Sequence, residues 1–544
     1  SGALGDFDAA RIRNFESIRV SSGRWQFTGQ TESATDVIVD RAGILSLSRP
    51  TTLNGNYSHA PLPLIPQPGD PEPTLQTILS VQTQAAPVLL TTGSADLANG
   101  LLDVVVGGGF RGEADFIVLQ ADGGLLGEFD SVLLSNDPNL IIGEPVYDLA
   151  NNRVLVSVNV SGYSDNQWAT SQAITGLSGT GIDPSLQDLI DQVESLEFSD
   201  YLSAMNQLGP EAYTAHTQAT LELGHRFVQL MLDRPRFCVP LSGQTSTDPR
   251  TQLACREHIF DPWITSYGQF SRREGSAGHI SFEDNAGGLA LGFDRRLNES
   301  LVISASVGTA YDSIQVDDVG PGNFTTLDLG FYAGYRRGPI RLQAVASYGH
   351  SWQERSRNIA IGDFVGVAEG VYGVDRLGIR AEVEYGIETE AFRIAPLISL
   401  DYTTLIQSEI AETGGGAAAL TLPSRNETAR TLRVGFDLTT ALHKQGYWTA
   451  LLENADGVWR PSLSVRWRQP LGATQQNVNA RFSAAPGELF SVQGDDSGQG
   501  FELGVGVDWT PLVADRLTFT LRYDGFLWEG VTSSALTGRI RLSF

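Results

Sequence analysis

The sequence contains only two cysteines, two methionines and almost no lysine, and it has no run of about 18 apolar residues. Without such a run, no helix of this chain is expected to cross a bilayer. Acidic residues outnumber basic ones by 63 to 37, which gives a formal net charge of −26. Because phosphate contacts need a basic surface, this excess of acid disfavours nucleic acid as a partner. Glycine is abundant, with 59 residues, and such a composition favours a mostly β fold over long helices.

The two cysteines, Cys238 and Cys255, lie in a stretch rich in proline, serine and threonine. In an oxidising compartment they are expected to form a disulfide that closes a short loop, with a stabilisation of roughly 3 kcal/mol in the chain-entropy model. A metal site is the alternative, but it needs more ligands, and the nearby sequence offers only His258.

No pattern typical of catalysis stands out. Among the seven histidines only His59 lies within the first 160 residues, so a Ser/His/Asp arrangement there would depend on one histidine in a proline-rich loop. Gly107-Gly108-Gly109 lacks the pattern that follows in a phosphate-binding loop. We therefore expect no enzyme activity, no catalytic residues, no cofactor and no metal.

Residues 1 to about 160 are expected to form short strands separated by turns. Apolar and polar residues alternate in 15–20 and 25–27, and similar runs recur at intervals of roughly ten residues. This pattern favours a right-handed β-solenoid, and a β-sandwich is the alternative. The segment from Ala60 to Pro73 holds six prolines and is expected to be a loop.

Residues 165–234 are predicted to be helical. Asp183-Pro184 supplies a cap, and apolar residues follow at helical spacing. A second helix is expected over 199–208, and a third over 211–232, which at 1.5 Å per residue is roughly as long as a bilayer core is thick. Polar residues occupy all faces of the third helix: Glu211, His216, Gln218, Glu222, His225, Arg226 and Gln229. A pore with polar walls suits this helix better than lipid does.

From residue 262 to the end, the sequence has a period of two. In the last strand Ile540 and Phe544 share one face, whereas Arg539 and Arg541 share the other. Such strands separate lipid from water, as in an outer-membrane barrel. Twelve are expected, near residues 263–270, 289–293, 301–311, 327–335, 340–348, 377–387, 392–402, 432–438, 462–468, 501–509, 517–524 and 535–544. A β-sandwich, the alternative, does not usually expose an apolar face on every strand.

The connections between these strands alternate in length, as in outer-membrane barrels. Tight turns are expected at 297–299, 337–339, 388–390 and 511–513. Longer loops are expected near 272–286, 312–324, 353–373, 405–425 and 470–498.

Seven arginines are expected to face the interior of this barrel: Arg380, Arg433, Arg466, Arg468, Arg522, Arg539 and Arg541. They have two sets of candidate partners. One is the pair of helix acids Glu211 and Glu222. The other is the set of acids on neighbouring strands: Glu382, Glu384, Glu502, Asp508 and Asp524. The sequence does not decide between these two sets of partners.

The chain resembles the type Va autotransporters, in which a β-helical passenger precedes a helical linker and a C-terminal translocator barrel. The resemblance rests on Gly209-Pro210-Glu211-Ala212-Tyr213 at the start of the third helix, on the count of twelve strands and on the terminal segment 539–544. It implies the following division: 1–97, β-helical passenger segment; 98–164, autochaperone-like passenger end; 165–234, helical linker and pore plug; 235–261, connector bridged by the cysteines; 262–544, outer-membrane translocator barrel.

The resemblance implies a protein of the bacterial outer membrane that translocates and displays its own N-terminal passenger on the cell surface. Its implied partners are membrane lipids, periplasmic chaperones and the barrel assembly machinery, which would read Ile540, Leu542 and Phe544. The passenger is expected to be adhesin-like or a structural stalk. The alternative is a solute-conducting barrel, or the carrier of an enzyme domain lost upstream of Ser1. Because the linker helix holds no Asn-Asn pair, we expect the passenger to stay attached or to be cut by another protease.

Overall fold

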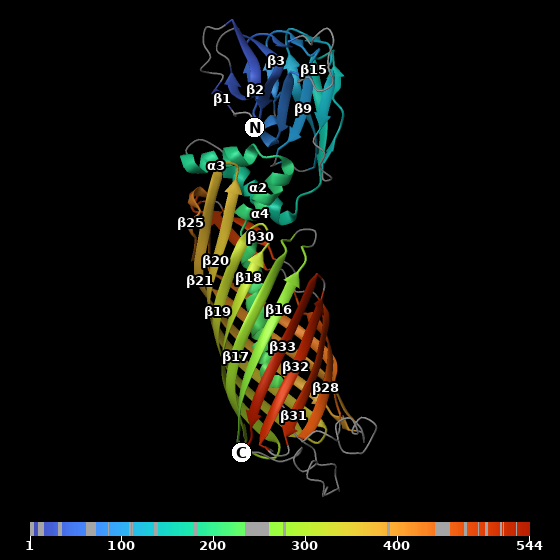
Figure 1. Cartoon of the computed structure of the whole chain (residues 1–544), viewed down its shortest axis with the longest axis vertical. Coiled ribbons are helices and arrows are strands. Elements are labelled where there is room, and N and C mark those ends of the chain that lie inside the picture. Colours follow the sequence, from blue (N-terminus) through green and yellow to red (C-terminus); the bar gives the residue numbers. More distant parts are fainter. Residues whose placement is uncertain are drawn as a thin grey trace. The chain divides into compact units, whose positions relative to one another are not determined.

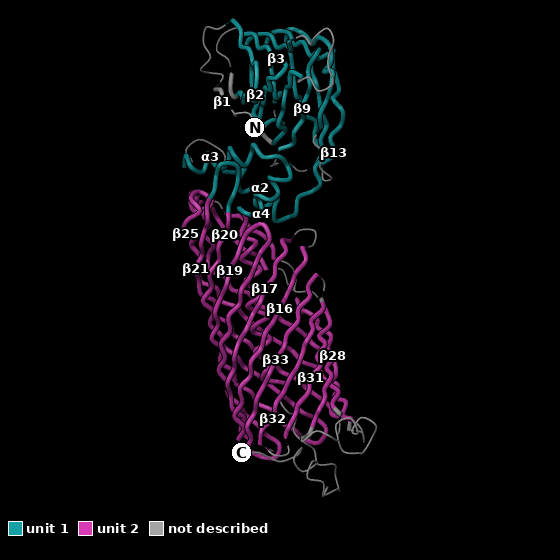
Figure 2. The backbone as a smooth tube through the Cα atoms, viewed as in Figure 1, with its two compact units in different colours: residues 1–208, 359–365 teal, residues 209–358, 366–544 magenta. Residues whose placement is uncertain are grey.

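A computed structural model describes residues 5–8, 16–30, 35–60, 72–84, 86–107, 110, 112–134, 140–177, 183–233, 260–275, 279–388, 392–440, 457–472, 476–487, 489–494, 499–511, 514, 516–528 and 530–544. It divides into two compact units: unit 1 holds residues 1–208 and 359–365, and unit 2 holds 209–358 and 366–544 (Figure 2). The predicted disulfide between Cys238 and Cys255 falls outside the described residues and stays a prediction.

Unit 1 consists largely of short strands that belong to one mixed sheet (Figure 1). They are β1 (Gly5–Asp8), β2 (Ser17–Gln30), β3 (Asp36–Leu47), β4 (Thr51–Leu53), β5 (Tyr57–His59), β6 (Thr74–Leu79), β7 (Leu89–Thr91), β8 (Ala95–Asp96), β9 (Leu101–Val106), β10 (Gly112–Ala121), β11 (Leu125–Leu126), β12 (Ser131–Leu134), β13 (Leu140–Ile142), β14 (Val146–Asp148) and β15 (Arg153–Val160). Three parallel ladders run through it: β2–β3–β6–β9–β12, β3–β5–β8–β11 and β2–β4–β7–β10. Strand β15 then pairs antiparallel with β10, β13 and β14.

Equivalent residues stack from strand to strand in these ladders. Leu45, Leu75 and Leu102 lie in register on β3, β6 and β9, and all three are fully buried. Beside them runs a line of polar side chains, in which Ser46 donates to Gln76 (2.8 Å) and Gln76 donates to Asp103 (2.7 Å). Stacked apolar rows exclude water, and the polar row satisfies its own hydrogen bonds.

His59 lies at the end of strand β5, whereas the sequence suggested a proline-rich loop. Its ring is buried, with Nε2 2.8 Å from the hydroxyl of Tyr57. Residues 61–71 of the predicted loop lie outside the described residues.

The predicted helical segment 165–234 is divided between the two units. Unit 1 contains α1 (Val81–Gln84), α2 (Asp165–Leu177), α3 (Pro184–Glu194) and α4 (Phe198–Leu208), and unit 2 contains α5 (Ala212–Leu232). Gly209-Pro210 separates α4 from α5, and proline interrupts a helix because it lacks an N–H donor. Of the helices the structure describes, none has the length and apolar composition that a membrane crossing requires.

Unit 2 is a closed antiparallel barrel of twelve strands, as the period of two predicted. The strands are β16 (Phe260–Arg273), β17 (Phe282–Arg296), β18 (Leu301–Val316), β19 (Gly320–Arg337), β20 (Ile340–Ile361), β21 (Phe364–Tyr385), β23 (Phe392–Gln407), β27 (Arg425–Thr440), β28 (Gly457–Pro470), β31 (Gly500–Pro511), β32 (Leu517–Trp528) and β33 (Val531–Leu542). Pairing of the last strand, β33, with the first, β16, closes the wall.

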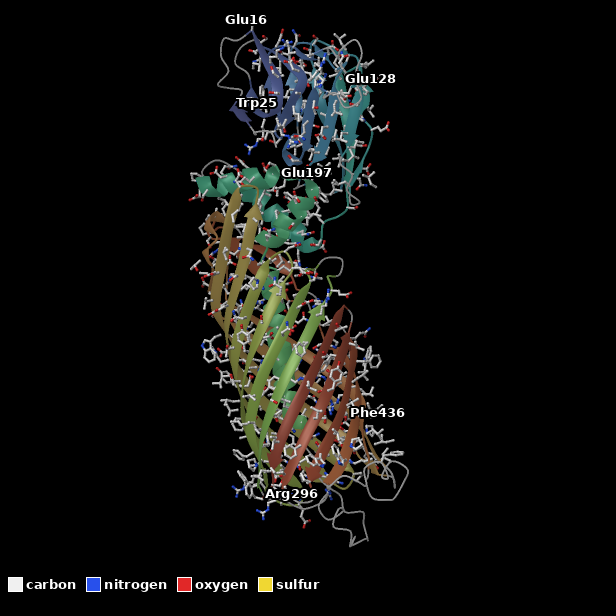
Figure 3. The ribbon with its side chains drawn as sticks, viewed as in Figure 1. Glu16, Trp25, Glu128, Glu197, Arg296 and Phe436 are labelled. Atoms are coloured by element: carbon white, nitrogen blue, oxygen red, sulfur yellow. The ribbon has the colours of Figure 1, made fainter. Side chains whose placement is uncertain are left out.

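Side chains of the wall alternate strictly between its two faces. Outward residues such as Phe436 are exposed (Figure 3), whereas inward ones such as Asp437 are buried. This alternation gives an apolar outside and a polar inside. Arg296 stands at the end of β17, beside the tight turn predicted at 297–299.

Two of the predicted long loops are mostly strand. In the segment 312–324, β18 continues to Val316 and β19 begins at Gly320, so only a three-residue turn separates them. The segment 353–373 is a hairpin, in which β20 runs to Ile361 and β21 begins at Phe364. The alternation of exposed and buried residues continues there. In the hairpin, outward residues are polar at the end of β20, such as Glu354 and Asn358, and apolar at the start of β21, where Val365, Val367 and Val371 are exposed. Glycine and acid in these segments suggested loops, although the backbone stays paired.

Two further predicted loops, 405–425 and 470–498, carry structure of their own. They contain β24 (Ile410–Ala411), β25 (Thr413–Gly414), the short helix η2 (Gly416–Ala418), β26 (Leu420–Leu422), β29 (Asn477–Phe482) and β30 (Phe490–Gln493), while β22 (Ile387–Glu388) precedes β23. Strands β24, β26, β29 and β30 form a small separate sheet. We call this end of the barrel the long-loop end, and the other, with turns such as 297–299 and 337–339, the tight-turn end.

Candidate functional site in the barrel lumen

Helix α5 lies inside the barrel (Figure 1), where 18 of its 21 residues are buried. A helix with polar residues on every face is buried this thoroughly only if its surroundings satisfy those residues. One stripe is apolar: Leu223, Phe227 and Met231 pack with wall residues that include Trp263 and Phe324. The rest of the helix meets the polar inner face of the wall.

Wall glycines make room for the helix. A Cβ atom at Gly308 would lie 2.7 Å from the ring of Phe227, and one at Gly330 would lie 2.2 Å from the sulfur of Met231. A Cβ atom at Gly322 would lie 2.2 Å from Nε2 of His216. Sequence reasoning missed these glycines, although each occupies an inward position where a polar side chain would otherwise face the lumen.

Hydrogen bonds from the wall hold α5 in place. Arg376 Nη1 donates to the backbone carbonyl of Thr220 (2.8 Å), and Gln353 donates to the hydroxyl of Thr220 (2.8 Å). Arg380 Nη1 donates to the side chain of Gln229 (2.7 Å). These donors come from β20 and β21, so one part of the wall holds the helix from its middle to its last turn.

Arg226 of the helix forms a buried ion pair with Asp524 of the wall (2.7 Å). Its polarity is opposite to the predicted pairing of helix acids with wall arginines. Glu211 instead accepts hydrogen bonds from the backbone N–H of Ile280 (3.0 Å) and from His279 (3.3 Å). A helix glutamate that meets a backbone donor needs no arginine, and spacing alone could not reveal this.

Most of the predicted lumen arginines are deeply buried: Arg380, Arg433, Arg466, Arg468 and Arg539 have exposed fractions of 2–6%. Arg541 is half-buried.

The wall pairing does occur among these residues. Arg433 pairs with Glu502 (2.8 Å) and with Asp401, and Arg522 pairs with Asp524 (2.8 Å). Buried charges need such partners, since an unpaired ion in this environment is costly.

The other predicted wall acids find a variety of donors. Glu382 accepts a hydrogen bond from Gln343 (2.8 Å), Glu384 pairs with Arg393, and Asp508 accepts from Thr520 (2.5 Å).

The C-terminal end of α5 is held by the last strand of the barrel. Arg539 of β33 donates to the backbone carbonyls of Leu230 and Asp233, and Arg522 lies 3.4 Å from the carboxylate of Asp233. Cations at a helix C-terminus interact favourably with its dipole and its free carbonyls. The sequence placed Arg539 in the lumen but gave no sign of this contact.

Two histidines of α5 have different surroundings. His216 is fully buried, and its Nδ1 lies 3.2 Å from Oε1 of Gln353. His225 lines a small cavity of about 30 Å³ between helix and wall, together with Glu222, Arg468 and other lumen residues. Among the described residues no cluster of histidines, cysteines and acids has a geometry that would hold a metal ion.

The terminal residues Ile540 and Phe544 are exposed on the outer side of β33, and Leu542 is half-buried. They therefore present an apolar row along the seam where β33 meets β16.

The sequence profile of the family Autotransporter β-domain matches residues 262–524. No curated protein sequence matches the chain. Among solved structures, the chain is similar to the translocator domain of the autotransporter NalP from Neisseria meningitidis, with 14% identity and a TM-score of 0.45 over 61% of this chain and 98% of that one.

Two further solved structures are similar to it. The β-domain of the Bordetella autotransporter BrkA has 16% identity and a TM-score of 0.39, over 53% of this chain and all of that one. The transport unit of AIDA-I from Escherichia coli has 12% identity and a TM-score of 0.37, over 57% of this chain and 93% of that one. With the profile match over most of the twelve-stranded barrel, the chain carries an autotransporter β-domain, a translocator barrel of the bacterial outer membrane.

Proposed function

We propose that this protein translocates its own N-terminal part through the outer membrane and displays it on the bacterial surface. The observation that carries the proposal is the position of α5. This helix follows unit 1 directly in the sequence and lies inside the barrel. A chain that leaves the cell through the lumen would end with this segment in place, and the segment would then fill the pore.

Unit 1 would be the displayed passenger, built as a right-handed β-solenoid. Support comes from its three parallel ladders and from the stacked leucines at 45, 75 and 102. Residues 98–164 would be its autochaperone-like end, because there the parallel stack gives way to the antiparallel pairing of β10 and β15. A role as adhesin or stalk, without enzyme activity, fits such an extended scaffold.

Assembly would involve the partners that outer-membrane barrels of this family use. Periplasmic chaperones would keep the chain unfolded, and the barrel assembly machinery would read the terminal strand through Ile540, Leu542 and Phe544. The passenger would stay attached, or another protease would cut it.

Protease treatment of intact cells tests the display. Unit 1 should be degraded from outside, while the barrel remains as a protected fragment that runs with different mobility before and after heating. If unit 1 is cut only after the outer membrane is broken, the proposal is wrong. A solute-conducting barrel, the alternative, predicts steady open-channel currents from the intact protein in planar bilayers.

A further inference from the structure

The N-terminal turn of α5 meets a buried group of side chains at the long-loop end of the barrel. Arg357 of β20 donates two hydrogen bonds to Glu412, at 2.7 and 2.6 Å, and both side chains are fully buried. Tyr213 of the helix donates its hydroxyl proton to the same carboxylate (2.7 Å). We call Tyr213, Arg357 and Glu412 the mouth cluster.

The loop that carries Glu412 is shaped around this carboxylate. Leu420 N–H donates to Glu412 (2.7 Å), and Arg357 also donates to the carbonyl of Ala418 (2.9 Å). The chain turns back between these contacts through Gly414, Gly415 and Gly416, whose φ angles of 72°, 64° and 54° are left-handed. Residues other than glycine rarely adopt such backbone angles. The three glycines therefore allow the tight turn that brings Glu412 and Leu420 together.

The Glu412 carboxylate therefore accepts hydrogen bonds from the wall and from its own loop, in addition to the one from the helix. Within the described part of the chain, Arg357 and Leu420 donate three hydrogen bonds to it, and Tyr213 adds a fourth from α5. A hydrogen bond to a buried, charged acceptor is stronger than one to an exposed acceptor. The hydrogen bond from the Tyr213 hydroxyl therefore stabilises the position of the helix more than an exposed one would.

Only one axial position of the helix provides this fourth donor. Residues four apart lie on the same face, one turn along. A shift by one turn would bring Gly209 or Thr217 to the place of Tyr213. Glycine has no side chain, and threonine is too short to replace the Tyr213 ring, which packs 5.8 Å from the ring of Tyr372.

We infer that the mouth cluster is a receptor for Tyr213 that sets where the translocating chain stops. The inference rests on the proposed translocation function. Once unit 1 has passed, Tyr213 reaches Glu412 and the helix is held with its first turn at the long-loop end. Glu412 is the positioning residue, and Gly370 leaves the space, since a Cβ atom there would lie 2.5 Å from the Tyr213 hydroxyl oxygen.

The test is hydrogen exchange of the full chain in detergent, followed peptide by peptide along α5. Tyr213→Phe keeps the ring and removes one hydrogen bond to a charged group. We expect amides of residues 212–219 to exchange about tenfold faster than in the unmodified protein. Gly370→Ala should give the same change through steric displacement of the hydroxyl.

Tyr332→Phe is the matched control. This buried tyrosine also donates to a lumen side chain, Gln343 (3.0 Å), but that partner belongs to the wall. Exchange in α5 should not change. If Tyr213→Phe also leaves exchange of 212–219 unchanged, while the barrel migrates as folded, the inference is wrong.

Surface display of the same variants separates the two proposals. If exchange rises in Tyr213→Phe but the unmodified protein never exposes unit 1 on cells, translocation is wrong, and with it the stopping role. If unit 1 is exposed and exchange does not respond, only the mouth cluster inference is overturned. Glu412→Gln serves as a second variant, and since it can unfold the loop, Tyr213→Phe and Gly370→Ala decide the result.

Discussion

At the scale of single residues, the fit between helix and wall depends on glycines that face the lumen. Gly308→Val would place methyl groups where the ring of Phe227 now lies, 2.7 Å from the added Cβ. Overpacking of this kind costs about 1–3 kcal/mol. We expect the variant to assemble as a barrel but to hold α5 less firmly, so that open-channel events in planar bilayers become roughly tenfold more frequent.

Gly287→Val is the matched control for this substitution. Gly287 lies on the outer face of the neighbouring strand β17, where an added Cβ would meet nothing within 4 Å. Its currents should equal those of the unmodified protein. Equal currents from both variants would show that Gly308 does not position the helix.

His59 makes the stability of unit 1 depend on pH. Burial lowers the pKa of its imidazole from 6.5 to about 4. In the unfolded chain, the His59 imidazole therefore binds a proton below about pH 6.5. In the folded unit, it stays neutral down to about pH 4. The free energy of unfolding should fall across this window as pH decreases, by about 3 kcal/mol in total, and stay constant above it.

Calorimetry of the full chain in detergent at pH 7.5 and pH 4.5 measures this change as a lower melting temperature of unit 1. His59→Gln should flatten the dependence. His350→Gln, in the barrel wall, should leave it intact. If the melting temperature of unit 1 still falls with decreasing pH in His59→Gln, this pH dependence comes from groups other than His59.

At the scale of elements, the last strand serves both the wall and the helix. Arg539→Met removes its hydrogen bonds to the carbonyls of Leu230 and Asp233. We expect amides in the last turn of α5 to exchange about tenfold faster, because charged donors at a helix C-terminus contribute up to about 2 kcal/mol. Arg295→Met, at the end of β17 and away from the helix, is the control and should have no effect.

The connector between α5 and the barrel carries the predicted disulfide of Cys238 and Cys255. Thiol labelling of the denatured, unreduced protein should detect no free thiol, and two after reduction. Two free thiols before reduction would exclude the bridge.

How far the sequence predicts each element depends on how local its cause is. The barrel strands follow from alternation within each strand, and α3 follows from its Asp183 cap and apolar spacing. The extended hairpin of β20 and β21 was missed because its segment is rich in glycine and acid, a composition typical of loops, although its strands continue.

The contacts of the site depend on residues far apart in the chain. Arg226 and Asp524 are 298 positions apart, and Tyr213 and Glu412 are 199 apart. Composition predicts that such charges face the lumen, but the partner of each is set by barrel register and by the position of the helix. Glu211 belonged to one of two candidate sets of partners for the wall arginines, and it accepts a hydrogen bond from the backbone of Ile280 instead.

At the scale of the whole molecule, we expect α5 to decide whether the barrel conducts. Deletion of residues 212–232 should leave the strands able to pair and should open the lumen, with planar-bilayer currents far larger than those of the full chain. Heat-dependent mobility on gels verifies that the barrel has formed. If the deleted and full-length proteins conduct equally, the helix does not close the pore.

The contact of Arg539 with the end of α5 also depends on the order in which the chain is synthesised. The ribosome makes this residue as part of the strand that closes the barrel, long after it has made the helix. A chain cut short by a premature stop would thus lose both the strand that seals the sheet and the cation that secures the helix. Incomplete copies would be defective in two ways at once, and one surveillance step at the last strand would be enough to reject them.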